Sequence, residues 1–84
     1  MATVAFEPEA FEQYNRLPER IKARVIRILA RLAQWPDVSG AKPLRGKLAG
    51  RFRIRTGDYR VQFRVEGTVV VIERVGHRDG FYGD

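Results

Sequence analysis

Arginine occupies every second position from Arg51 to Arg55, and further arginines follow at Arg60 and Arg64. Gly57-Asp58 lies between these two groups and suits a two-residue hairpin turn, because glycine readily adopts the positive φ that such a turn needs. Counting outward from this turn pairs Arg55 with Arg60. Side chains alternate between the faces of a strand. One face of the predicted hairpin therefore carries Arg53, Arg55, Arg60, Gln62 and Arg64, and the other carries Phe52, Ile54, Val61, Phe63 and Val65.

The predicted arginine face breaks a rule of sheet stability. Arg55 lies opposite Arg60, and like charges directly across a sheet are destabilising. Such violations tend to occur where function resides. An anion that bridges several guanidinium groups would relieve the repulsion, and a nucleic-acid phosphate is an obvious candidate. The 16 basic and 10 acidic residues, for a net charge of +6, also favour a polyanionic partner.

The composition excludes several classes of site. There is no cysteine and only one histidine among 84 residues, so we expect no disulfide, no transition-metal site and no cofactor. The N-terminus lacks the basic and apolar regions of a signal peptide. The longest apolar run, from Val69 to Ile72, is far too short to span a membrane. We therefore expect a cytoplasmic protein without membrane association.

The N-terminal half has the pattern of a strand and two helices. Residues 3–6 form an apolar run, and Pro8 then suits the first position of a helix that continues to Leu17. Pro18 separates this helix from a second one, which Pro36 ends. In the second helix the apolar residues have amphipathic spacing: Ile21, Val25, Ile28, Leu29, Leu32 and Trp35. Its basic side chains are expected to face solvent.

The C-terminal half begins with a loop and ends with a strand. Residues 37–50 are rich in glycine and are predicted to form a basic loop. Glu66-Gly67 is taken as the second hairpin turn, which pairs Phe63 with Val70 and Val61 with Ile72. This register places three further apolar residues on the arginine face, namely Val69, Val71 and Val75.

These elements predict one small α+β domain over residues 1–84, in the order β-α-α-β-β-β. The two helices cover the apolar face of a four-stranded, mainly antiparallel sheet. The first strand is expected to run parallel to the last through a right-handed crossover.

Three motifs give the chain a family resemblance. LRG, GDYRVQF and VGHR occur in this order within LRGKLAGRFRIRTGDYRVQFRVEGTVVVIERVGHRDGFY. The chain resembles the RelE/ParE superfamily of toxins from type II toxin–antitoxin systems, and the match covers nearly its whole length. This resemblance implies a RelE-like fold.

The resemblance also implies a set of functional residues. RelE-type members are ribosome-dependent mRNA endonucleases, whereas ParE-type members act on DNA gyrase and lack the nuclease residues. All five positions of the RelE-type set are filled here, by Arg53, Arg55, Arg60, Arg78 and Tyr82. We also expect RNA contacts from Arg45, Lys47, Arg51 and His77. The RelE-type activity, a metal-independent endoribonuclease acting on mRNA on the ribosome, is therefore favoured.

The chemistry implied is attack of a ribose 2′-OH on the adjacent phosphate. Such a reaction requires a base, stabilisation of the phosphorane charge and a proton donor for the leaving oxygen. The arginines can clamp the phosphate, and guanidinium groups nearby would favour the phenolate of Tyr82 as base. Arginine is a poor proton donor, so the general acid stays open between Arg78, His77 and a water molecule.

Two alternative functions and one partner follow from the same resemblance. The chain could be a ParE-like inhibitor of gyrase, or a basic RNA-binding module without catalysis. In either toxin class we expect a cognate, RelB-like antitoxin in a hetero-oligomer, with an acidic segment docking on the helices and on the side of the sheet that carries Val69, Val71 and Val75. Codon preference, antitoxin identity and oligomeric state are not encoded in any pattern found in the sequence.

Overall fold

Five strands form one mixed sheet in the computed structural model, which describes residues 1–81. In chain order they are β1 (Thr3–Phe6), β2 (Lys42–Pro43), β3 (Arg51–Thr56), β4 (Tyr59–Glu66) and β5 (Val69–His77). Across the sheet the order is β1-β5-β4-β3-β2. The β1 strand runs parallel to β5, and all other neighbours are antiparallel. The α+β class and the parallel pair are confirmed, whereas the prediction of four strands omits β2.

The additional strand arises inside the predicted loop. Lys42 pairs with Arg53, and Pro43 pairs with Phe52. A two-residue strand has no periodicity that a sequence pattern could reveal. Its consequence is local but important, because it ties the loop that follows α2 to the edge of β3.

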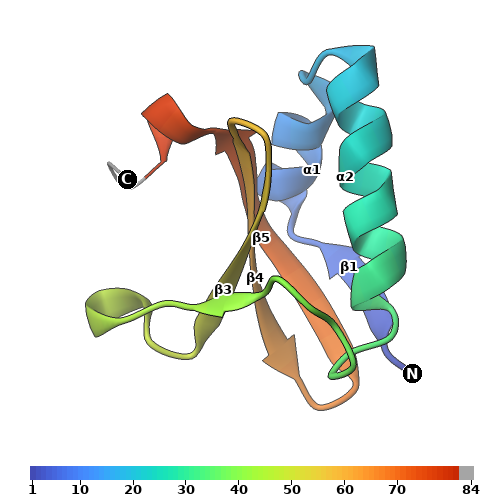
Figure 1. Ribbon diagram of the computed structural model, residues 1–84, viewed down its shortest axis with the longest axis vertical. Helices are drawn as coiled ribbons and strands as arrows, with labels where there is room; N and C mark the ends of the chain where they lie inside the picture. Colours follow the sequence, from blue (N-terminus) through green and yellow to red (C-terminus); the bar gives the residue numbers. More distant parts are fainter. Residues whose placement is uncertain (82–84) are drawn as a thin grey trace.

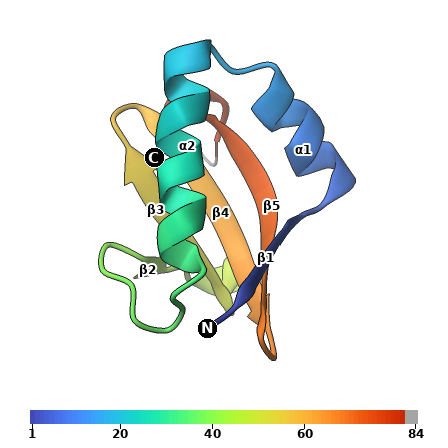
Figure 2. The same ribbon diagram turned by 90° about the vertical axis from the view of Figure 1, so that its right-hand side faces the viewer.

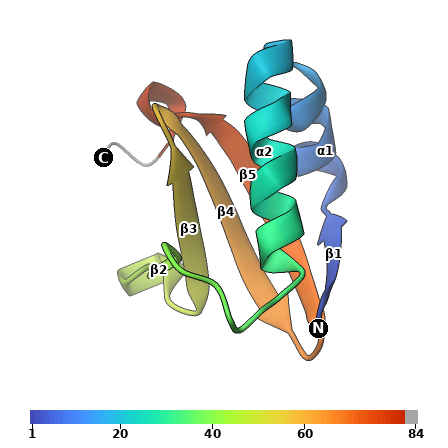
Figure 3. The same ribbon diagram turned by 45° about the vertical axis from the view of Figure 1, so that its right-hand side comes forward.

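Two helices, α1 (Pro8–Asn15) and α2 (Glu19–Leu32), cover one face of the sheet (Figures 1 and 3). Pro8 lies in the first turn of α1, as predicted, where it has no helical hydrogen bond to lose. The buried side of α2 packs on the sheet to form the core, which includes Ile21, Val25, Ile28, Leu32, Ile54, Val61, Phe63, Val70 and Ile72. Figure 2 shows α2 in front of the sheet and β1 alongside β5.

The register of the first hairpin is confirmed. Arg55 pairs with Arg60, and Phe52 pairs with Phe63. Gly57 has a φ of 58°, which a glycine turn residue adopts without strain. The predicted arginine face and apolar face of β3 and β4 therefore exist as separate surfaces.

The predicted register of the second hairpin is wrong. The turn residues are Gly67 and Thr68, one position later than predicted, and Phe63 pairs with Ile72 instead of Val70. Val61 pairs with Val75 instead of Ile72, because a bulge between Gln62 and Phe63 adds one position to the shift caused by the turn. An extra residue in a strand shifts all later side chains to the other face. Val75 consequently lies in the core, 3% exposed, and not on the arginine face.

The arginine face is flanked by two short 3₁₀ turns. They are η1 (Gly46–Leu48), which follows β2, and η2 (Arg78–Gly80), which follows β5. Figure 1 shows both on the side of the sheet away from the helices. Within residues 1–81, neither helix has the length and apolar character that crossing a membrane requires.

Candidate functional site

A basic cleft of about 610 Å³ lies on the arginine face, between the β2 loop and the start of η2. It is lined by Lys42, Pro43, Leu44, Arg45, Arg53, Arg55, Arg60 and Arg78. Six of these eight residues are basic, and none of the described residues that line the cleft is acidic. The structure thus brings together the four arginines predicted to be catalytic. Tyr82, the fifth predicted residue, lies outside the described residues.

The floor of the cleft comes from the first hairpin. Arg53 and Arg60 are largely buried, at 8% and 3% exposure, whereas Arg55 is exposed. Arg60 Nη1 lies 3.5 Å from the carbonyl oxygens of Gly57 and Tyr59. Buried guanidinium groups have few alternative rotamers, so this floor presents its charge at fixed positions. An arginine offers five donors in a rigid fork that matches phosphate oxygens.

The wall opposite the β2 loop is formed by Arg78. Its backbone N–H donates a 2.7 Å hydrogen bond to the carbonyl of Asp58, which fixes η2 beside the hairpin turn. Its side chain is about half exposed and lies 3.8–3.9 Å from the carboxylates of Asp58 and Asp79. Ion pairs at this distance and exposure are weak. Arg78 is therefore able to exchange these contacts for a ligand phosphate.

The bulge in β5 explains how Arg78 reaches this face. Gln62 pairs with Arg74 and Phe63 pairs with Ile72, so Glu73 is the residue left over. From Arg74 onward the side chains occupy the opposite faces to those that a regular strand would give them. Gly76 therefore lies opposite Arg60, and the residues that follow it lead into the cleft wall.

A second cluster of charges lies at the other end of the arginine face. Glu73 accepts hydrogen bonds from Arg51 Nε at 2.9 Å, from Gln62 Nε2 at 3.1 Å and from Arg64 Nη1 at 2.7 Å. Arg64 also pairs with Glu7 at 2.8 Å and with Glu66 at 2.5 Å. We call this set of residues the Glu73 cluster. Here the arginines are neutralised by carboxylates of the chain itself.

The electrostatics of the Glu73 cluster follow from these contacts. Burial alone would raise the pKa of Glu73, but the hydrogen bonds from Gln62, Arg64 and Arg51 outweigh it and hold the pKa below its ordinary value. The hydrogen bonds of Arg64 to Glu7, Glu66 and Glu73 raise its pKa, so its charge is permanent. The cluster is a fixed network of opposite charges at neutral pH.

The predicted RNA-binding residues are divided between different places. Arg45 lines the cleft. Lys47 is exposed in η1 and Arg51 belongs to the Glu73 cluster, so neither lines the cleft. His77 stacks edge-on against Tyr59, with ring centroids 5.2 Å apart, and its Nδ1 accepts a hydrogen bond from the backbone of Asp79.

Sequence reasoning missed Lys42 and Glu73. Lys42 enters the cleft through the pairing of β2, which has no local signal. Glu73 is the single acidic residue in the sequence of β5, directly before an arginine, and this was the available sign of a charge partner. Among the described residues, no group of three or more His, Asp or Glu side chains could hold a metal ion.

Comparisons with known proteins agree with this fold. A family model for the ParE toxin of the type II toxin–antitoxin system, parDE, matches residues 4–80. The toxin RelG of Mycobacterium tuberculosis is 40% identical over 82 residues, which are 95% of this chain and 94% of RelG.

Solved structures give the same result. The RelBE2 toxin–antitoxin complex of Mycobacterium tuberculosis matches with a TM-score of 0.80 and 40% identity, over 99% of this chain and 93% of that one. The RelB–RelE complex of Methanococcus jannaschii matches with a TM-score of 0.78 and 23% identity, over 93% of this chain and 94% of that one. The second similarity is one of fold.

Proposed function

The chain belongs to the RelE/ParE superfamily of type II toxin–antitoxin toxins, and from this premise we propose that it is a metal-independent, ribosome-dependent mRNA endonuclease. The observation that carries the proposal is the basic cleft, where six cations converge without an acidic residue among the described lining residues. In the Glu73 cluster, by contrast, Arg51 and Arg64 share one largely buried carboxylate. The chain's action on ribosomes would place it in the cytoplasm.

The proposed reaction is attack of the ribose 2′-OH on the adjacent phosphorus. The P–O5′ bond breaks as the new O2′–P bond forms, which gives a cyclic phosphate and a free 5′-OH. Arg53, Arg55 and Arg60 bind the non-bridging oxygens and stabilise the charge that grows on them in the phosphorane. Arg78 binds the same group from the cleft wall.

Proton transfer requires a base and a proton donor. We assign the base to the phenolate of Tyr82 from the resemblance to RelE-type toxins, because guanidinium groups beside a phenol favour its ionised form. His77 lies against Tyr59 and does not line the cleft, which leaves Arg78 or a water molecule to protonate the 5′ oxygen. Arginine holds its proton strongly, so water bound by Arg78 is the better donor.

The test is cleavage of a 5′-labelled mRNA on programmed ribosomes. Arg55→Ala, Arg78→Ala and Tyr82→Phe are each expected to lower the cleavage rate by about 10²- to 10⁴-fold. Arg27→Ala removes an exposed arginine of α2 that does not line the cleft and should leave the rate unchanged. Full cleavage by all three site variants would remove the proposed site.

The match to the ParE family model favours inhibition of DNA gyrase as the second candidate function. In that case the basic cleft would bind a protein surface. Inhibition of purified gyrase by a chain that leaves ribosome-bound mRNA intact would select it. RNA binding without cleavage and without gyrase inhibition would instead indicate a basic RNA-binding module.

We propose a RelB-like antitoxin as the partner in a hetero-oligomer, since two of the matched structures are complexes of RelB and RelE proteins. Val69 and Val71 are half-buried on the arginine side of β5, and Phe11 and Ile26 are about half exposed on the helices. These apolar side chains suit an amphipathic, acidic segment. Hydrogen exchange of the complex should show protection of β5 or the helices, and its absence there would count against this docking.

A further inference from the structure

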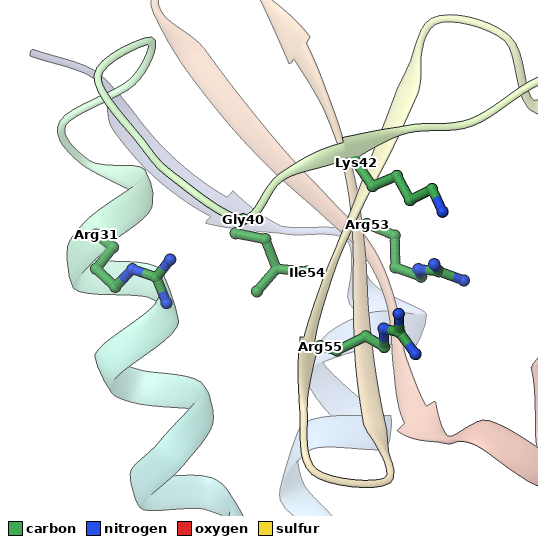
Figure 4. A pocket seen from close by; sticks show the side chains of 6 residues that line it. All are labelled: Arg31, Gly40, Lys42, Arg53, Ile54 and Arg55. Carbon is green, nitrogen blue, oxygen red and sulfur yellow. The ribbon is translucent and has the colours of Figure 1, made fainter.

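A smaller pocket of about 180 Å³ adjoins the basic cleft at the edge of β3 (Figure 4). It is lined by Arg31, Gly40, Lys42, Arg53, Ile54 and Arg55. Lys42, Arg53 and Arg55 line the cleft as well, so the two hollows are adjacent and share these three side chains. With less than a third of the volume of the cleft, the pocket suits one anionic group better than a nucleoside.

Arg31 is the cation that the smaller pocket adds. Figure 4 shows its side chain extending from α2 toward β3, whereas Lys42, Arg53 and Arg55 extend from the far side of the strand. Its Nη2 donates a 2.5 Å hydrogen bond to the carbonyl of Ser39. Within residues 1–81, no carboxylate forms an ion pair with Arg31, so its charge is held in place without being neutralised.

The loop that holds Arg31 is shaped for this contact. Gly40 has a φ of 87°, and a Cβ atom there would lie 3.4 Å from Arg31 Nη2. The backbone therefore passes close to the guanidinium group, and β2 begins two residues later. The loop thus binds Arg31 through the carbonyl of Ser39, and it leads into the short strand that brings Lys42 to the cleft.

The charges at the two ends of the arginine face favour one direction for a bound polyanion that leaves the cleft. Beyond the cleft on one side, Arg51 and Arg64 are engaged by Glu73. On the other side, the adjacent pocket is lined by Arg31. A polyanion leaving the cleft meets carboxylates in the first direction and a further cation in the second.

We propose that Arg31, with Lys42, forms a second phosphate subsite, which binds the backbone of single-stranded RNA next to the phosphate held in the cleft. The inference rests on the proposed function for the identity of the polyanion. It adds Arg31, which lies outside the catalytic set, to the RNA-binding residues. It also gives the bound RNA a path across the edge of β3 toward α2.

The experiment measures binding apart from cleavage. The purified chain is titrated into labelled 2′-O-methyl oligonucleotides of two and five nucleotides, which lack the attacking hydroxyl, at several salt concentrations. Arg31→Ala should weaken binding of the longer probe by about tenfold. It should also reduce the salt slope by about 0.7, the amount for one phosphate contact in a single strand. Binding of the two-nucleotide probe, which has a single phosphate, should stay unchanged.

Two further variants distinguish the effect of the Arg31 charge on binding from an effect on the structure of the loop. Arg31→Gln keeps a donor for Ser39 but removes the charge, and it should lose affinity as Arg31→Ala does. Arg27→Ala removes an exposed charge from the same helix, lines neither hollow, and should retain the wild-type salt slope. An Arg31→Gln variant with wild-type affinity, or equal losses for Arg31→Ala and Arg27→Ala, would overturn the subsite.

The outcome is distinguishable from failure of the proposed function. A wild-type chain that shows the Arg31-dependent slope but does not cut mRNA on ribosomes would refute the nuclease and retain the subsite. A chain that cuts mRNA while Arg31→Ala binds like Arg27→Ala would refute the subsite and retain the nuclease.

Discussion

The two ends of the arginine face begin from the same local arrangement and reach opposite results. At one end Arg51 pairs with Arg64, and at the other Arg55 pairs with Arg60. Both pairs place like charges directly across the hairpin. At the first end Glu73 lies between the arginines, while the second opens into a cleft whose described lining includes no acid.

This difference arises from one residue in the neighbouring strand. Glu73 is the extra residue of the β5 bulge, and its side chain is 9% exposed. Glu73 follows Val71 on the arginine face by ordinary alternation and reaches Arg51 and Arg64, while the bulge reverses the faces of the residues that follow it. The Glu73 carboxylate thus neutralises one end, and the bulge leads the chain to Arg78 at the other. Whether an arginine pair in this sheet is neutralised or left beside an open cleft therefore depends on what the adjacent strand contributes.

The largest expected effect on stability comes from removing Glu73. Glu73→Ala leaves Arg51 and Arg64 facing each other in a partly buried site without their shared acceptor. Loss of one member of such a network is expected to lower the free energy of unfolding by about 2–4 kcal/mol. Urea denaturation, monitored by circular dichroism, measures this change in the free energy of unfolding.

The control for Glu73→Ala is Glu66→Ala, which removes another carboxylate that pairs with Arg64. The Glu66 side chain is 61% exposed, so its loss should cost about 1 kcal/mol or less. If both variants lose the same free energy of unfolding, Glu73 is not the cause of the difference between the two ends of the arginine face.

A smaller effect should distinguish the two arginine pairs directly. Arg51→Ala removes a partner of Glu73 and should lower the free energy of unfolding by about 1 kcal/mol. Arg55→Ala removes a charge that faces Arg60 and should raise the free energy of unfolding by about 0.5 kcal/mol, while the proposed nuclease activity falls. Thermal unfolding of both variants at low salt shows whether each substitution lowers or raises the stability. If Arg55→Ala loses as much stability as Arg51→Ala, the two arginine pairs do not differ in this way.

Patterns within one hairpin were sufficient to predict the arginine face. Gly57-Asp58 defines a two-residue turn, and strict alternation then fixes the faces of Arg53, Arg55 and Arg60. Pro8 and Pro18 likewise mark the starts of the two helices through a local property, the missing N–H, whereas α2 ends at Leu32, before Pro36. The presence of Arg78 in the site came from the family resemblance, and the structure locates it at the cleft.

The parts that the sequence did not reveal depend on contacts between distant segments. The β2 strand exists through its pairing with β3, and the bulge at Glu73 is held by side chains from positions 51, 62 and 64. The second turn was misplaced by one residue because Gly67 belongs both to the predicted dipeptide, Glu66-Gly67, and to the observed one, Gly67-Thr68. Val75 was assigned to the wrong face because the bulge at Glu73 reverses the faces of the residues after it. Arg51, which was predicted to contact RNA, binds Glu73.

The smallest expected effect is a change in pH dependence. The pKa of Glu73 is lowered in the folded chain, so its ionised form stabilises the fold above the ordinary carboxyl pKa of about 4.3. This contribution is lost as the pH falls from that value through the lower pKa of the folded state. The difference in unfolding free energy between wild type and Glu73→Gln should therefore be largest near neutral pH and shrink on acidification.

Urea midpoints of wild type and Glu73→Gln at several values between pH 7 and pH 3 measure this dependence. Glu12→Gln, in which the altered side chain is 70% exposed on α1, is the matched control for losing a carboxylate. If the Glu73→Gln difference is constant across this range, the carboxylate does not stabilise its end of the sheet through its charge. The contrast with the cleft would then rest on hydrogen bonding alone, because an amide can still accept from Arg51 and Arg64.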